Sequence, residues 1–264
     1  MILLLLTLNL SLQQPNVIRA TVYPSGANPQ PGITAGWQKM VPYRDGYFNP
    51  QLGKLLSDIE SQLDPNHIYR HEDRTIWAHE ATHGINSRAR QALPQRWNAF
   101  YCFNKRCFVI SEPNVTKSQV AEFIPSNCRG QSFNLYVKEP PPLPGYESWE
   151  NQPLHLIDEY TAYLNGLEVS QQLNLRVAPD SDLWLAVELA GYAGALVRCI
   201  EKYDASYVHK DKLIEYINYC NSRTGHYMPS ATDQRIKSLA QAVKGEYGNE
   251  NSNARPTPAS YVGQ

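Results

Sequence analysis

The chain has little of several features that would assign it to a class at once. Its 24 Lys and Arg side chains nearly balance its 25 Asp and Glu side chains, and the net charge at pH 7 is -1. Because these charges are scattered, we do not expect an extended nucleic-acid-binding surface. No internal repeat is evident, and the five cysteines contain no C-x-x-C spacing, which disfavours a zinc site built from thiolates. A peptide or protein is the expected partner.

The apolar run at the N-terminus, residues 1–12, is too short to span a bilayer. It resembles the hydrophobic region of a secretory signal peptide, although no Lys or Arg precedes it and Ile18 stands two positions before the candidate cleavage site at Ala20. We therefore predict a signal peptide over residues 1–20, no stable membrane insertion after its removal, and a secreted or extracytoplasmic protein. The alternative is a buried strand or helix at the start of the domain.

The cysteines are compatible with export. Cys102 and Cys107 flank a four-residue loop between two runs rich in aromatic and β-branched residues, 97–101 and 108–110. This pattern predicts a hairpin closed by a disulfide. Cys199 and Cys220 lie in consecutive helical segments and are a second candidate pair. Cys128 is then left unpaired.

The most informative feature that is present is the pentad His79-Glu80-Ala81-Thr82-His83. Residues four apart on an α-helix differ by only about 40° around the axis, so both imidazoles can reach one metal ion from the same face. Glu80 projects to the flank of that face, where a carboxylate can take a proton from water activated by the metal. Asp73 and Thr75 supply N-terminal caps for this helix. The alternative is an exposed helix that carries a His pair and a solvated Glu.

A catalytic zinc site usually takes three protein ligands and leaves a fourth position for water, so a third ligand must come from elsewhere. The metzincin extension is absent, since Asn86 and Ala89 stand where its Gly and third His would be. Residues 156–163 predict a second helix with Asn151 as its cap, and Glu159 on that helix is the preferred ligand. Two neighbours remain alternatives, depending on the rotation of the helix: His155, which could also hydrogen-bond a ligand, and Asp158.

These residues resemble the gluzincin branch of the zincin metallopeptidases, in which a Glu on a second helix completes a His, His, Glu site. The resemblance covers two short segments and includes a small residue, Ala162, one turn after Glu159. Thermolysin-like members have an Asp where this chain has Tyr163, and the E-x-x-A pattern with a hairpin between the motifs is closer to the lethal-factor-type toxin peptidases. The resemblance implies Zn²⁺ held by His79, His83 and Glu159, with Glu80 as the general base for peptide hydrolysis.

An oxyanion formed during hydrolysis needs a hydrogen-bond donor opposite the metal. Seventeen tyrosines make this donor hard to choose from sequence. Tyr163 shares a helical face with Glu159, Tyr146 lies in a Gly/Pro-rich loop before that helix, and His226 is placed in a loop at 224–227. We therefore carry Tyr163 and His226 as catalytic candidates, with Tyr146 as a further donor.

The expected architecture is α+β, a mostly helical, zincin-like single domain over residues 21–245 with a small sheet or hairpin and a helical C-terminal half. Residues 21–50 are expected to form an irregular wrap, and residues 131–138 alternate as a half-buried strand would. Residues 183–197 predict a central buried helix whose glycines admit close neighbours. The tail, residues 246–264, lacks periodicity and predicts disorder.

Two other hypotheses compete with the hypothesis of a peptidase. The first is a secreted binding module on a zincin scaffold that keeps the metal and hydrolyses nothing; a damaged Glu80 would be its sign, and Glu80 is intact. The second is a helical protein without a metal, whose stability a chelator would leave unchanged. The sequence does not determine substrate preference, zymogen control or oligomeric state.

Overall fold

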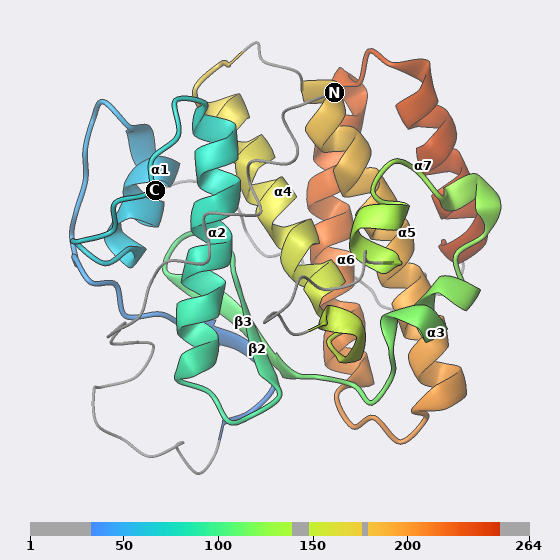
Figure 1. Ribbon diagram of the computed structural model, residues 1–264. Coiled ribbons are helices and arrows are strands. Elements are labelled where there is room, and N and C mark those ends of the chain that lie inside the picture. The colour runs from blue at the N-terminus through green and yellow to red at the C-terminus, as the bar shows by residue number, and fades with distance from the viewer. Residues whose placement is uncertain (1–32, 139–147, 176–178, 249–264) are drawn as a thin grey trace.

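A small antiparallel sheet lies among the helices of a mostly helical α+β chain (Figure 1). The computed structural model describes residues 33–138, 148–175 and 179–248. The strands are β1 (Gly36–Lys39), β2 (Trp97–Tyr101) and β3 (Arg106–Ser111), in the order β1-β3-β2. The hairpin expected between the two motifs is confirmed as β2 and β3. β1 was not predicted, because it is four residues long and lies in a segment rich in Pro and Gly.

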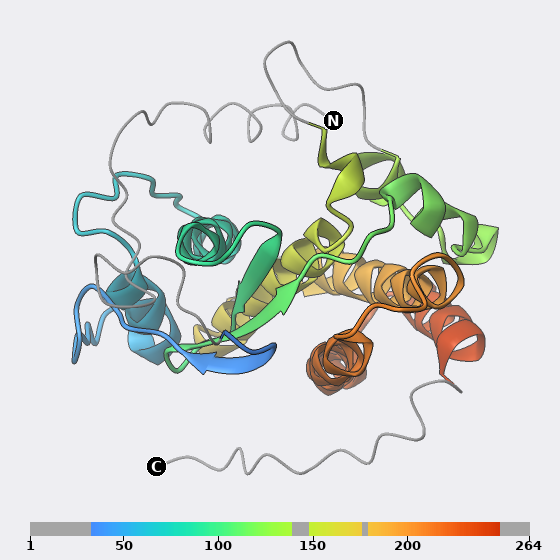
Figure 2. The same cartoon turned by 90° about the horizontal axis from the view of Figure 1, so that it is seen from below.

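Seven α-helices are found in the described part of the chain. They are α1 (Gly53–Gln62), α2 (Arg74–Gln91), α3 (Lys117–Glu122), α4 (His155–Gln172), α5 (Pro179–Tyr203), α6 (Lys210–Tyr227) and α7 (Gln234–Tyr247). The sheet lies between the α1 and α2 side of the molecule and the side that holds α5, α6 and α7 (Figure 2). The helical C-terminal half is confirmed.

The sheet separates two apolar cores because successive side chains of a strand point to opposite faces. Phe108 and Ile110 of β3 belong to the larger core with α4, α5 and α6. Cys107 and Val109 belong to the smaller core with α1 and α2. The four side chains are fully buried, so both faces of this short sheet are covered.

The predicted Cys102–Cys107 disulfide is wrong, and the alternation of the strands explains why. Tyr101 is the partner of Cys107 across the hairpin, so Cys102, one residue later, points to the opposite face. Its Sγ lies 3.1 Å from the Tyr216 hydroxyl in the larger core, whereas Cys107 is buried in the smaller one. All five cysteines, each within the described residues, are buried free thiols, and this includes the second candidate pair.

The predicted strand over residues 131–138 is also wrong, since Phe133–Val137 forms one turn of π-helix. The carboxylate of Glu188 in α5 is fully buried and accepts the backbone N–H groups of Gln131 and Ser132 at 2.7 and 3.0 Å. A strand needs those N–H groups for its ladder. Their capture by Glu188 turns the chain at this point and brings residue 136 toward α4.

Helices α5 and α7 pack closely through glycines of α5, as expected for the segment 183–197. A Cβ at Gly191 would lie 3.0 Å from Val243, and one at Gly194 would lie 2.6 Å from Tyr247. Tyr247 is buried and ends α7, so the ordered chain extends past the boundary predicted at residue 245. The rest of the predicted tail and the predicted signal peptide lie outside the described residues.

One helix of the described chain, α5, is long and apolar enough to cross a membrane over Ser181–Tyr203. In the structure, 72% of that apolar window is buried against other parts of the protein. The same length and composition are found in the core helix of a globular domain, which is the role predicted for it.

The side-chain amide of Asn165 connects the helices that carry the two motifs to the sheet. Nδ2 of Asn165 in α4 lies 3.1 Å from the Thr82 hydroxyl of α2 and 2.9 Å from the Tyr101 carbonyl of β2. Its Oδ1 accepts a hydrogen bond of 2.8 Å from Arg223 of α6. Asn165 is fully buried, and both ends of its amide are used.

Candidate metal centre

α2 presents the pentad because its start is fixed by a cap and its apolar side is fully buried. The Asp73 carboxylate accepts the backbone N–H groups of Thr75 and Ile76 at 2.8 and 3.3 Å, so Asp73 is the cap and Thr75 lies inside the helix. Trp77 and Ala78 pack into the smaller core. The helix runs on through Gly84, with His79 and His83 one turn apart and both partly exposed.

α4 lies antiparallel to α2 (Figure 1). Arg90 near the end of α2 contacts Asp158 near the start of α4, and Thr75 at the start of α2 lies beside Gly166 in the second half of α4. It begins at His155 after Leu154, and the predicted cap Asn151 instead ends a short 3-10 turn. The helices approach closely where side chains are small, because a Cβ at Gly166 would meet Thr75 at 3.2 Å and Ala162 is fully buried.

Three side chains from these helices converge on one point. Nε2 of His79 and Nε2 of His83 lie 3.1 Å apart, and Oε2 of Glu159 lies 3.6 and 3.5 Å from them. With metal–ligand bonds of about 2.0–2.1 Å, the edge of a tetrahedron is about 3.4 Å, whereas an octahedral edge is about 3.0 Å. The mean edge of this triangle fits the tetrahedron better.

The third member of the triangle has an unsatisfied atom. Oε2 of Glu159 is buried and has no hydrogen-bond partner among the described residues. A buried carboxylate oxygen without a partner is costly, and a cation between it and two imidazoles removes that cost. Burial would raise the pKa of Glu159, but the neighbouring His83 outweighs it and lowers the pKa to about 2. The donor set therefore fits a divalent metal ion.

Asp158, one of the alternative ligands, does not lie at the triangle but behind the His83 ring. Its Oδ1 lies 2.8 Å from Nδ1 of His83, the ring nitrogen that faces away from the triangle. Asn86 donates to the same oxygen at 2.9 Å, and Arg90 donates to Oδ2. A carboxylate on Nδ1 keeps the proton there and leaves the lone pair of Nε2 for a metal, which is how outer groups orient ligands at zinc sites.

His155, the other alternative, lies on the outer side of Glu159. Its Nε2 is 3.4 Å from Oε1 of Glu159, and its ring stacks on Trp149 with centroids 4.7 Å apart. Nζ of Lys117 lies 3.2 Å from Nδ1 of His155, and the Lys117 side chain is fully buried. These contacts orient the Glu159 carboxylate so that Oε1 faces His155 and Oε2 faces His79 and His83. Lys117 carried no sequence signal.

Two tyrosines lie next to the triangle. The ring of Tyr163 is 4.3 Å from the ring of His79, and its hydroxyl is 2.9 Å from the hydroxyl of Tyr136. Burial raises the pKa of Tyr136 far above the usual range, and the negative charge of Glu159 adds to that rise. Tyr136 was missed because residues 131–138 predicted a strand. The π-turn that carries Tyr136 has no recognisable sequence pattern, so no signal in the sequence indicated this residue.

The other donors proposed from sequence do not join the cluster. His226 is exposed in the last turn of α6, where its ring contacts Tyr227. α6 packs on the side of α4 that carries Tyr160, whose hydroxyl meets Thr224, and not on the side that carries Glu159. Tyr146 lies outside the described residues.

Glu80 is half-buried on α2 beside the triangle. Burial raises its pKa, and the negative charge of Glu159 adds to that rise, while His83 opposes it. A carboxylate with a raised pKa accepts a proton more readily, which suits a general base near neutral pH. The arrangement thus combines three ligand atoms, an oriented imidazole, a basic carboxylate and two hydroxyl donors.

The chain matches no protein-family model, no curated protein and no solved structure. Its function must therefore be argued from the chemistry of the site.

Proposed function

We propose that this protein is a secreted zinc metallopeptidase with a zincin-like fold, in which His79, His83 and Glu159 hold the metal. The observation that supports this most is the triangle of donor atoms, with edges of 3.1, 3.5 and 3.6 Å, together with the buried, unpartnered Oε2 of Glu159. Two histidines and a carboxylate are also a ligand set of non-haem iron, but octahedral iron favours shorter edges. Glu80 beside the pair favours hydrolysis.

Zn²⁺ bound there supplies Lewis acidity that polarises a peptide carbonyl and acidifies water. The protein's own groups provide the rest. Glu80 takes the proton of the attacking water and delivers it to the leaving amine. Asp158, fixed by Asn86 and Arg90, keeps the His83 ring in the tautomer that exposes Nε2. The hydroxyls of Tyr136 and Tyr163 are the proposed donors for a developing oxyanion.

The first test measures bound zinc per chain by elemental analysis in the wild type and in His83→Ala and Glu159→Ala. We expect close to one zinc in the wild type and loss in both variants. A control, Glu122→Gln, changes an exposed carboxylate on α3 and should keep the zinc. Wild-type protein without zinc, even after refolding with the metal, would overturn the proposal.

The second test separates hydrolysis from mere metal binding. Glu80→Gln keeps the size of the side chain and is expected to retain zinc while hydrolysis of a peptide library falls by about 10²–10⁴-fold. Wild-type protein that holds zinc but cleaves no peptide would leave the metal site intact and point instead to a binding module.

A further inference from the structure

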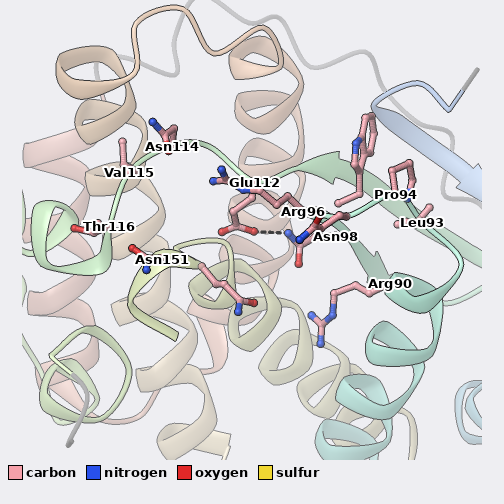
Figure 3. A pocket seen from close by; sticks show the side chains of 13 residues that line it. Arg90, Leu93, Pro94, Arg96, Asn98, Glu112, Asn114, Val115, Thr116 and Asn151 are labelled. Carbon is pink, nitrogen blue, oxygen red and sulfur yellow. Dashed lines mark hydrogen bonds between the residues drawn. The ribbon is translucent and has the colours of Figure 1, made fainter. Parts of the chain in front are cut away.

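A polar cavity of about 650 Å³ lies where the C-terminal end of α2 meets the sheet (Figure 3). Its walls come from the end of α2, the start of β2, the chain after β3 and the turn before α4. The polar groups that matter here are Arg90, Arg96, Asn98, Glu112, Asn151 and Gln152. The volume is within the range of small-ligand sites, about 300–1,000 Å³, and the side-chain amides can both donate to and accept from a peptide backbone.

Arg96 is an exposed cation that lines this cavity beside Glu112. Its Nη2 donates to the Pro113 carbonyl at 3.1 Å, and it forms no ion pair with any described residue. The backbone of Arg96 has a φ of 64°, a left-handed conformation that is uncommon for residues other than Gly. The Glu112 N–H holds this turn by a 2.6 Å hydrogen bond to the Arg96 carbonyl.

Glu112 does not neutralise Arg96 by contact, because its carboxylate is used elsewhere. Oε1 accepts the Leu154 N–H at 2.7 Å, and Oε2 accepts from the side chain of Asn98, as Figure 3 shows. Burial raises the pKa of Glu112 to about 7, so at neutral pH its own charge is only partly present. The cavity therefore offers a guanidinium to an incoming anion.

Arg90 links the cavity to the metal centre. It lines the cavity and also donates to Asp158, which orients His83. His79, His83 and Arg90 occur at i, i+4 and i+11, so they share one face of α2. The seven residues from His83 to Arg90 correspond to about 10 Å along the helix axis, a distance that about three residues of extended peptide span.

We propose that this cavity is the subsite that recognises a carboxylate of the peptide substrate, with Arg96 as the residue that binds it. This inference depends on the proposed function and specifies its substrate class: peptides that carry an acidic group away from the cleaved bond. The carboxylate is an acidic side chain or the C-terminus of the peptide, two sources of one chemistry.

Binding is tested on full-length Glu80→Gln loaded with zinc, which does not consume the probe. Titration calorimetry compares blocked alanine octapeptides that carry one Glu or one Gln, and the Gln peptide with a free C-terminus. We expect the acidic peptides to bind about tenfold more tightly, and Arg96→Gln to abolish that preference. Arg96→Lys retains the charge and should keep part of it. Arg235→Gln on α7 removes one exposed arginine elsewhere and should leave it unchanged.

Equal affinity for the Glu and Gln peptides, or an acidic preference that survives Arg96→Gln, would overturn the inference. Melting temperatures of the Arg96 variants establish that they are folded. Hydrolysis by the wild type, with the Glu moved along the peptide, then locates the preferred position. Glu80-dependent cleavage of all peptides at equal rates refutes the subsite but keeps the peptidase, whereas Arg96-dependent binding without any cleavage refutes the peptidase but keeps the subsite.

Discussion

Oδ1 of Asp158 lies 2.8 Å from Nδ1 of His83, on the side of the imidazole that faces away from the triangle of ligand atoms. The same carboxylate receives Asn86 and Arg90, and Asp158 is 1% exposed. We therefore predict that Asp158 influences metal affinity at the proposed site although it is not one of the proposed ligands.

Asp158→Asn is expected to weaken zinc binding by about 10–100-fold, because an amide neither carries the charge that holds Arg90 nor polarises His83 as strongly. A competition titration against a zinc chelator measures the affinity. The control Glu122→Gln should match the wild type. An unchanged zinc affinity in Asp158→Asn would show that His83 is oriented by packing alone.

Tyr136→Phe removes the hydroxyl that hydrogen-bonds the Tyr163 hydroxyl next to the triangle. We expect kcat for peptide hydrolysis to fall by about 10–100-fold with zinc retained, since one donor near the reacting carbonyl is lost. Steady-state kinetics with elemental analysis test this. Tyr203→Phe, which removes an exposed hydroxyl bonded to Glu122, is the matched control. Full activity in Tyr136→Phe would remove this residue from the mechanism.

Gly194→Ala places a methyl group 2.6 Å from the ring of Tyr247. We expect a loss of about 1–3 kcal/mol in the free energy of unfolding, measured in urea, because α5 and α7 must move apart. Gly225→Ala on α6 is the control: a Cβ there has open space, and Ala is the better helix former by about 1 kcal/mol. Equal stability of Gly194→Ala and wild type would mean that α7 does not pack on α5 in solution.

Glu112 predicts a pH dependence of stability. Its pKa is about 7 in the folded protein and 4.5 as the ordinary value, so the folded state favours the protonated form. The stabilisation is complete below about pH 4.5 and is lost as the pH rises through about 7, a change on the order of 3 kcal/mol. Urea unfolding of wild type and Glu112→Gln between pH 4.5 and 8 measures it. Asp182 also has a raised pKa, so the difference between the two curves isolates Glu112.

The cysteines predict a simple chemical result. Alkylation in denaturant, without reductant, should modify all five thiols, and a reductant should leave the melting temperature unchanged. Mass spectrometry counts the modified residues. A protein with three modified thiols and one disulfide would contradict the opposite orientations of Cys102 and Cys107.

Local signals in the sequence were enough for the elements that carry the three candidate ligands. The i,i+4 spacing of His79 and His83, the Asp73 cap and the small residue after Glu159 are properties of single helices, and each has the expected place in the structure. The close approach at Gly191 and Gly194 followed from composition in the same way.

Contacts between distant segments account for what sequence did not predict. Tyr136 reaches the site because Glu188, more than fifty residues later, takes the N–H groups that a strand would have used. Lys117 and Arg90 reach the site through contacts with residues of α4. The disulfide prediction failed by one position of strand register, which sequence spacing does not specify.

Asn165 gives the site a mechanical property. Moving α2 relative to α4 or to the hairpin would break the hydrogen bonds of the buried Asn165 amide to Thr82 and Tyr101. Rotating the Asn165 side chain would also break its hydrogen bond with Arg223. Helices and hairpin therefore form a single stiff frame around the three ligand atoms. A frame of this kind holds its ligands at the required spacing before any ion arrives, so entry of the ion requires little rearrangement of the backbone.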